Sequence, residues 1–267
     1  MVNSILNFIV TTSLGARADQ FALAARISVE TGITYAARGT KTINELQDKW
    51  KTDGIVVVEP LRITCIIGES EFFFHPAMAV IRIKEIKSGK NDQMIKAMDL
   101  HQGQRLLDCT LGLATDAIVA SYILGPGGFV LGIENSPLVA SIVRIGLQKR
   151  YKKTGHNVLK AMNEIKVLKG DHRLILQDLP DNSFEVVYFD PMFRVPRSKS
   201  SGINALRPLA DHRPIMPDVL ASALRVATKR VVVKENRWDY ELKKLGFDII
   251  EGGRNSSVRY GIRYKDG

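Results

Sequence analysis

Residues 105–134 read RLLDCTLGLATDAIVASYILGPGGFVLGIE and contain, in order, an apolar run, a glycine turn, a helical pattern and a second apolar run. The two apolar runs are rich in Leu, Val and Ile and lack polar alternation, which is typical of parallel strands covered on both faces. A helical pattern over residues 116–124 lies between them. A strand, a crossover helix and a second strand together indicate a doubly wound α/β fold.

The same alternation continues along the chain. Further strands are predicted in IKVLKG, FEVVYFD and RVVVKE, and helices over residues 137–152, 172–176, 217–227 and 238–245. The last two apolar runs, FDIIEGG and VRYGIRYK, are joined by a turn near residues 255–257, so they must pair antiparallel. Parallel strands ending in an antiparallel hairpin resemble the Rossmann-like, seven-stranded sheet of class I methyltransferases.

The chain before this region has a different composition of elements. A strand over residues 5–12 and a helix over 18–30 are followed by the short runs GIVVVEP, RITCIIG and SEFFFHP, which Gly and Pro separate. We therefore predict a small N-terminal α+β domain over residues 1–88 and the larger domain over residues 89–267.

Composition limits the class of protein. The 267 residues carry a net charge of +10, which favours a polyanionic partner because Lys and Arg displace the counterions of phosphates. Two cysteines give neither a zinc-ligand spacing nor a disulfide framework. No apolar run approaches the roughly 20 residues of a membrane span, and the N-terminus lacks the basic start of a signal peptide. We expect a cytoplasmic protein without a metal.

Ligands of open α/β sheets bind beyond the carboxyl ends of the strands. The first such strand is followed by Gly112, which permits a tight turn and a close ligand approach. Asp108 suits a cationic, amine-bearing ligand, and Thr115 or Asp116 can cap the next helix, leaving amide groups for a carboxylate. These features fit S-adenosylmethionine better than a dinucleotide, whose G-x-G-x-x-G pattern is missing.

The next two strands end in residues suited to a nucleoside. Glu134 lies about twenty residues beyond the glycine turn, where a carboxylate accepts the hydroxyls of a ribose. Asp171 is placed either to accept from an adenine amino group or to cap the following helix, and His172 lies at the surface or the adenine edge. Glu134 therefore predicts a nucleoside ligand, but it does not distinguish NAD from S-adenosylmethionine, since both contain this ribose.

The fourth strand ends in Asp190-Pro191-Met192-Phe193. The Asp190 carboxylate and the Pro191 carbonyl can each accept one N–H of an amine and so aim its lone pair, which is catalysis by orientation. Phe193 offers an aromatic face to a base taken out of its stack. The tetrapeptide resembles the D/N-P-P-Y/F motif of amino methyltransferases, with Met192 at the second proline.

A long basic loop follows this motif. We expect it to contact the phosphate backbone of RNA through Arg194, Arg197, Lys199, Arg207 and Arg213. A second basic stretch near the domain boundary comprises Arg82, Lys84, Lys87 and Lys90. A run of charges more often marks a solvated face, but its combination with the Asp190–Phe193 motif favours nucleic acid here.

The runs LLDCTLGLATDAIVAS, GIENSPLVASIVRIGL, VVYFDPMF and LRVATKRVVVK are together similar to the bacterial YhiQ-like family. The resemblance implies methylation of guanosine N2 in small-subunit ribosomal RNA. It also implies that S-adenosylmethionine is lined by a set of strand-end residues: Thr115, Asp116, Glu134, Asn135, Asp171, His172 and Asp190. The chain departs from the family's pattern at Thr115, at Asp171-His172 and at Arg194-Val195.

Two other functions remain open. The first is a methyltransferase acting on a small amine-bearing metabolite or a protein side chain, and the second is a non-catalytic RNA-binding module. Methyl transfer from labelled cofactor separates the first from an RNA methyltransferase, and cofactor binding separates the second.

Overall fold

The structure, a computed structural model, describes residues 6–152, 154–192, 206–238, 241–247, 249–253 and 256–265. The described chain divides into two compact units. One lies within Met1–Phe74 and Arg197–Leu209, and the other within His75–Pro196 and Ala210–Gly267. Each unit contains its own β-sheet, of five strands in the first and seven in the second.

The first unit is an α+β fold, as predicted for the N-terminal part. Its elements are β1 (Phe8–Thr12), α1 (Ala18–Thr31), β2 (Thr34–Tyr35), α2 (Ile43–Trp50), β3 (Gly54–Val58), β4 (Ile63–Ile67), β5 (Ser70–Phe73) and the 3₁₀ helix η1 (Arg207–Leu209). The strand order is β2-β1-β3-β4-β5, with β1 parallel to β2 and β3, and the last three strands antiparallel. Strands β1 and β3 are buried along their whole length, and Leu46 of α2 packs among Ile9 and Ile55.

The second unit alternates strands and helices. Its elements are α3 (Ala77–Lys87), α4 (Gln93–Met98), β6 (Arg105–Asp108), α5 (Thr115–Leu124), β7 (Phe129–Glu134), α6 (Pro137–Leu147), α7 (His156–Asn163), β8 (Ile165–Lys169), α8 (His172–Asp178), β9 (Phe184–Phe189), α10 (Pro217–Val226), β10 (Ala227–Asn236), α11 (Glu241–Lys244), β11 (Ile249–Glu251) and β12 (Val258–Tyr264). The strand order is β11-β12-β10-β9-β6-β7-β8. Strands β10, β9, β6, β7 and β8 are parallel, whereas β12 runs antiparallel between β10 and β11. The predicted fold class is therefore confirmed.

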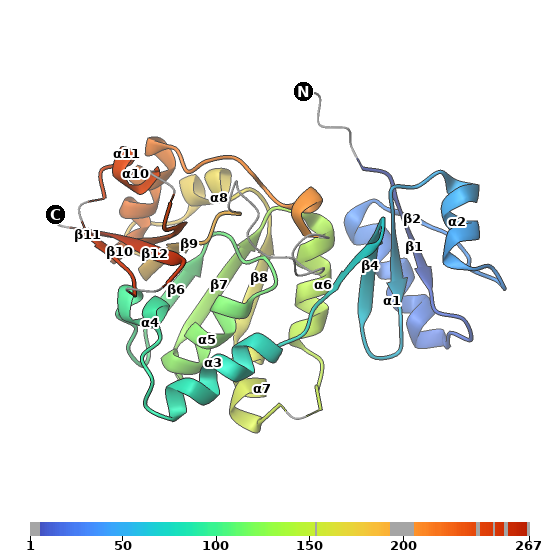
Figure 1. The fold of residues 1–267 in the computed structure, drawn as a ribbon, viewed down its shortest axis with the longest axis horizontal. Coiled ribbons are helices and arrows are strands. Elements are labelled where there is room, and N and C mark those ends of the chain that lie inside the picture. The colour runs from blue at the N-terminus through green and yellow to red at the C-terminus, as the bar shows by residue number, and fades with distance from the viewer. Residues whose placement is uncertain are drawn as a thin grey trace. The chain divides into compact units, whose positions relative to one another are not determined.

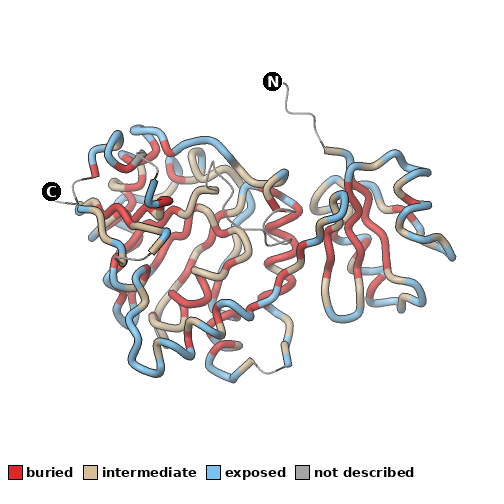
Figure 2. Tube along the Cα trace, in the orientation of Figure 1, coloured by how far each residue is buried: buried red, intermediate tan, exposed pale blue. Residues whose placement is uncertain are grey.

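Helices cover both faces of this sheet (Figure 1). Contacts join α3, α5, α6 and α7 on one face and α8 with α10 on the other. The main core lies under α8, α10 and α11, where Val187, Phe189 and Val231 are fully buried. Figure 2 shows the buried residues concentrated in the central strands. Continuous apolar strands bury both faces, which explains why the sequence lacks alternation here.

The strand register fixes the position of the candidate residues. Asp108 at the end of β6 lies beside Gly132 of β7 on one side and Tyr188 of β9 on the other. Glu134 and Asp190 follow these neighbours by two residues each, so they extend past Asp108 at the same sheet edge. Because β7 and β9 lie on opposite sides of β6, the strand order reverses here, and such a point opens a crevice for ligands.

Some elements differ from the predicted ones. The helix predicted over residues 137–152 ends at Leu147, and α7 follows as a separate helix. Helix α2 and strand β2 were not predicted. Helix α3, inside the predicted domain of residues 1–88, contacts α5 of the second unit. The domain boundary after residue 88 stays a prediction.

Candidate active site

Backbone hydrogen bonds tie the loop after β6 to both neighbouring strands. The Cys109 N–H donates to the carbonyl of Tyr188, and the Leu111 N–H donates to the carbonyl of Ile133, each at 2.9 Å. The Asp190 N–H donates to Thr110 Oγ1 at 2.5 Å. The start of the Asp190-Pro191 turn is thereby joined to the loop that contains Gly112.

This loop has a left-handed backbone at two positions, Gly112 with φ +49° and Ala114 with φ +59°. Leu111 between the strand and the turn lies directly on Gly132, where an added Cβ would be 2.5 Å from Leu111 Cδ1. Gly132 thus permits the close approach of the loop to β7. A Cβ at Gly112 would meet only the Thr110 carbonyl, 3.9 Å away. The turn therefore presents bare backbone, and an added Cβ would meet no close neighbour among the described residues.

Glu134 closes the other side of this turn. Its Oε2 accepts the Gly112 N–H at 3.0 Å and its Oε1 accepts the Ser136 N–H at 2.8 Å. Burial raises the pKa of Glu134, and these backbone donors oppose the rise. Each carboxylate oxygen offers two lone pairs, so both oxygens can still accept from a pair of hydroxyl groups. The residues fit a nucleoside ribose at this position.

A line of alternating charges runs behind the turn. It comprises Asp92, Arg82, Asp116, Lys234 and Asp190, in that spatial order. Arg82 donates to Asp92 at 2.8 Å and to Asp116, and Lys234 Nζ lies 3.1 Å from Asp116 Oδ2 and 2.7 Å from Asp190 Oδ2. The five side chains are each less than a third exposed, so solvent screens these pairs weakly.

The protonation of the central carboxylates follows from these neighbours. Burial acts to raise the pKa of Asp116, but Lys234 and Arg82 outweigh it and hold that pKa below its usual range. The Tyr188 hydroxyl, which donates to Asp116 Oδ2 at 2.8 Å, acts in the same direction. Burial raises the pKa of Asp190, and the ammonium of Lys234 opposes the rise.

Asp108, the last residue of β6, is 2% exposed. Its Oδ1 accepts the Thr110 N–H at 3.0 Å. Burial raises the pKa of Asp108 to about 8, against the opposing effect of the Thr110 hydrogen bond. The carboxyl predicted to face a cationic ligand therefore keeps its proton at neutral pH until a cation approaches it.

The residues after β8 are linked to the site through the end of β7. The Gly170 N–H donates to the Glu134 carbonyl at 2.9 Å, which aligns the end of β8 with the site. Asp171 caps α8 through the Arg173 N–H at 3.0 Å and also binds the Arg173 guanidinium at 2.8 Å. Arg213 reaches the same carboxylate at 3.2 Å. The predicted helix cap at Asp171 is confirmed, and the contact with adenine stays a prediction.

Three further predicted positions lie around this edge. The ring edge of His172 meets Phe189, with centroids 5.6 Å apart. Asn135 is exposed, and Thr115 is half-buried in the first turn of α5. Gly112 contacts Glu134 directly, Lys234 links Asp116 to Asp190, and Thr110 contacts both Asp108 and Asp190. Pro191 is half-buried next to Asp190, and Phe193 lies outside the described residues.

Lys234, Arg82 and Tyr188 contact the predicted carboxylates although none was predicted to belong to the site. A lysine within the apolar strand RVVVKE was a usable signal, because a buried ammonium requires a counter-charge. Arg82 was predicted with the exposed basic stretch. Its guanidinium instead lies 20% exposed between Asp92 and Asp116.

The expected RNA loop is described only in part. Arg194, Arg197 and Lys199 lie outside the described residues. Arg207 begins η1 in the first unit. Arg213 is exposed, and its guanidinium binds Asp211 at 2.7 Å, so part of its charge is balanced within the chain.

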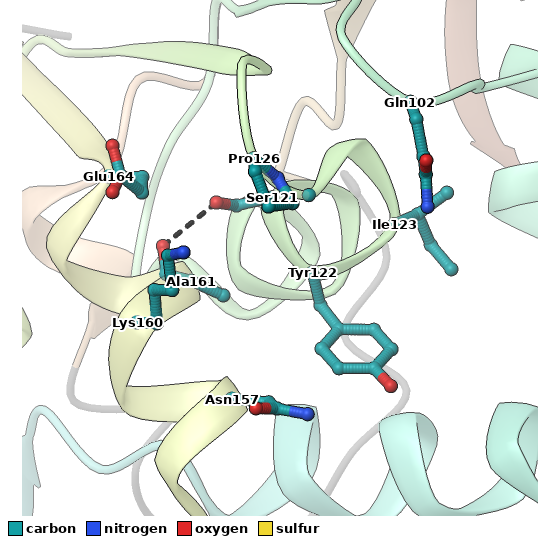
Figure 3. A pocket seen from close by; sticks show the side chains of 10 residues that line it. Gln102, Ser121, Tyr122, Ile123, Pro126, Asn157, Lys160, Ala161 and Glu164 are labelled. Atoms are coloured by element: carbon teal, nitrogen blue, oxygen red, sulfur yellow. Dashed lines mark hydrogen bonds between the residues drawn. The ribbon is translucent and has the colours of Figure 1, made fainter.

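A cavity of about 420 Å³ lies between α5 and α7 (Figure 3). Its lining comprises Gln102, Ser121, Tyr122, Ile123, Gly125, Pro126, Asn157, Lys160, Ala161 and Glu164. The Ser121 hydroxyl donates to the Ala161 carbonyl across it at 2.8 Å. Gln102, Pro126 and Glu164 precede strands β6, β7 and β8, so this cavity lies at the amino ends of the strands. Ligands of such sheets bind at the opposite edge.

Within the described ranges, no helix is both long and apolar enough to cross a membrane. The same part of the chain brings no three His, Cys, Asp or Glu side chains into a metal-binding group. Both cysteines are buried thiols.

Comparisons with a family model, with curated proteins and with solved structures each find methyltransferases. A family model described as "Putative SAM-dependent methyltransferase" matches residues 72–261. Protein YpiP of Bacillus subtilis is 36% identical over 254 residues, which cover 95% of this chain and 98% of YpiP. Ribosomal RNA small subunit methyltransferase J of Coxiella burnetii is 31% identical over 174 residues, covering 63% of this chain and 65% of that enzyme.

The enzyme of the same name from Pseudomonas fluorescens is 32% identical over 162 residues. These alignments span less than two thirds of either methyltransferase J. Among solved structures, a SAM-dependent methyltransferase from Neisseria gonorrhoeae superposes with a TM-score of 0.67 at 16% identity, covering 97% of this chain and 96% of that one.

Proposed function

The chain belongs to the family of SAM-dependent methyltransferases, whose model spans residues 72–261, and we propose that it methylates an exocyclic amino nitrogen in ribosomal RNA. We propose guanine N2 as that nitrogen, as the YhiQ-like resemblance implies. The cofactor of the family is S-adenosylmethionine. Two of the relatives, which align over part of their length, are named ribosomal RNA small subunit methyltransferases. These names support the choice of RNA, as does the net charge of +10.

The observation that carries this proposal is the position of Asp190. Its backbone is bonded to Thr110 in the loop before Gly112, and that loop is bonded in turn to Glu134. A carboxylate at the end of β9 is thus held next to the turn and the carboxylate that fit a nucleoside cofactor. An acceptor bound in this crevice would meet Asp190.

Bound S-adenosylmethionine supplies an electrophilic methyl group, and the protein has to orient the nitrogen that receives it. Asp190 Oδ2 accepts from Lys234 at 2.7 Å. Within the described part of the chain, Asp190 Oδ1 accepts no hydrogen bond, so it can take one N–H of the amine. The Pro191 carbonyl takes the second N–H, which turns the nitrogen lone pair toward the cofactor. We assign the stacking of the base to Phe193.

We assign the cofactor to the residues that surround the Gly112 turn. Glu134 accepts the ribose hydroxyls, and Asp108 and Asp116 provide negative charge on the side of the amino and sulfonium groups. We assign the remaining contacts with the cofactor to four neighbouring residues: Thr115, Asn135, Asp171 and His172. Asp171 is already saturated by Arg173 and Arg213, so we expect it to shape the adenine site more than to bind adenine.

Labelled methyl transfer tests the proposal. We take ribosomal RNA and small subunits from cells lacking this protein, and a matched extract of proteins and metabolites. Each is incubated with the purified protein and labelled cofactor, and modified nucleosides are mapped. We expect label in N2-methylguanosine of the RNA. Label confined to proteins or small amines would refute the RNA substrate, and cofactor binding without transfer to any fraction would refute catalysis.

Asp190→Ala tests the role of the carboxylate. We expect kcat to fall on the order of 100-fold, because loss of orientation alone is worth about that much, while the unit stays folded. Asp178→Ala is the matched control, since it removes an exposed carboxylate from α8. Unimpaired turnover in Asp190→Ala would remove Asp190 from the mechanism.

A further inference from the structure

Lys234 lies in β10, a strand whose neighbours Val231, Val232 and Val233 are buried. Its side chain is 18% exposed, and its ammonium contacts two carboxylates, Asp190 at 2.7 Å and Asp116 at 3.1 Å. A lysine has three N–H donors, and two of them are used here on oxygens from different elements.

Packing alone does not require a lysine at this position. Apolar residues of similar volume often replace buried ion pairs without loss of stability, whereas an unpaired buried charge is strongly destabilising. A lysine between two carboxylates is therefore best explained by what its charge does to them. Asp116 already has a second cation in Arg82, but Asp190 contacts no cation other than Lys234 among the described residues.

We propose that Lys234 is a positioning residue for Asp190, whose ammonium fixes Oδ2 and keeps the carboxylate ionised, so that Oδ1 is left as the acceptor for the substrate amine. This inference rests on the role proposed for Asp190. Asp116 serves as the second anchor of the ammonium, and Arg82 fixes Asp116 from α3.

The charged and titratable groups around Asp190 determine the direction in which loss of Lys234 shifts the pKa of Asp190. The groups that face it are Lys234 on β10, Asp116 on α5, Arg82 on α3, Asp108 on β6, Tyr188 on β9 and Tyr260 on β12. Burial and Asp116 raise the pKa of Asp190, and Lys234 is the strongest opposing neighbour. Without Lys234, Asp190 takes up a proton at higher pH. A protonated carboxyl donates from one oxygen, so it no longer orients an amine in the same way.

Carboxyl titration by NMR tests the ionisation directly and needs neither cofactor nor RNA. Aspartate labelled with ¹³C at the carboxyl carbon is incorporated into the wild type and Lys234→Met, and Asp190→Asn assigns the signal. We expect the midpoint of Asp190 to rise by about one pH unit or more in Lys234→Met, a tenfold or larger change in proton affinity. An unchanged midpoint would overturn the proposal.

Catalysis supplies the second readout. In Lys234→Met, kcat should fall most at the acid end of the pH profile and recover as the pH rises, because deprotonation of Asp190 is regained, while Lys234→Arg should restore most of the activity. Lys229→Met, an exposed lysine of the same strand, should match the wild type. An equal loss at every pH, or no rescue by Lys234→Arg, would overturn the positioning role.

If Lys234→Met does not fold, Lys234→Gln replaces it, since Gln removes the charge but keeps a hydrogen-bond donor on a slightly shorter side chain. Failure of the proposed function is distinguishable from failure of this inference. A wild type that leaves RNA unmethylated refutes the RNA substrate, whereas the titration midpoint of Asp190 supports or overturns the effect of Lys234 in either case.

Discussion

Replacing Asp108 by Asn should stabilise the second unit at alkaline pH and leave its stability nearly unchanged in acid. Asp108 is 2% exposed, and its Oδ1 accepts the Thr110 N–H at 3.0 Å. Asn has almost the same shape, and its carbonyl can accept the same hydrogen bond. The substitution therefore removes the ability to ionise with little change in packing.

The magnitude follows from the pKa of Asp108, which burial raises to about 8, against roughly 4 in an unfolded chain. Between these two values the unfolded carboxyl is ionised while the folded one keeps its proton. The folded state then binds more protons, so stability falls as the pH rises and stops falling above pH 8. At about 1.4 kcal/mol for each tenfold change in proton affinity, the loss reaches up to about 5 kcal/mol. Asn does not titrate and avoids this loss.

Urea unfolding from about pH 5 to about pH 9 at constant ionic strength measures the difference. The chain has two tryptophans, so a Trp50→Phe background leaves Trp238 as a reporter within the second unit. Asp178→Asn, which changes an exposed carboxylate, is the matched control and should give no pH-dependent difference. If the advantage of Asp108→Asn is constant across this range, or grows toward acid pH, the burial argument is wrong.

Two further outcomes are expected from the same loop. Gly132→Ala should lower stability by about 1–3 kcal/mol through overpacking and weaken binding of S-adenosylmethionine, because its Cβ would displace Leu111. Adding Leu111→Ala should recover part of both, and no recovery would exclude this steric cause. Calorimetry should also show cofactor affinity rising toward pH 8 with proton release in the wild type, as a cation ionises Asp108. Asp108→Asn should show neither effect, and equal pH dependence in both proteins would separate Asp108 from the cofactor.

In the proposed mechanism, cofactor binding and substrate orientation share a single edge of the second sheet. The Gly112 turn contacts Glu134 on β7 through one hydrogen bond and lies next to Asp190 on β9 through Thr110. Gly112 adopts its left-handed backbone without strain, whereas the left-handed backbone of Ala114 is strained and lies in the loop to which we assign the cofactor. Left-handed backbone at a non-glycine residue persists where function or surrounding structure requires it.

Local pattern was sufficient to predict the sheet and the position of several site residues. Continuous apolar runs separated by helical patterns permit only a parallel sheet covered on both faces. In such a sheet the carboxyl ends of neighbouring strands meet at one edge. Gly112, Glu134 and Asp190 could therefore be predicted to converge without any knowledge of distances.

The partners of those residues were decided by tertiary structure alone. Asp116, Arg82 and Lys234 come from α5, α3 and β10, and 152 positions separate the last two in the chain. No local pattern records which distant charges will face each other, because that depends on strand order and on the faces that the helices cover. The sequence by itself determined at which edge of the sheet the carboxylates would lie, because strands buried on both faces form a parallel sheet whose carboxyl ends meet at one edge. Only the folded structure decided which of them are paired and which keep a proton, because burial and opposite charges act across space and not along the chain.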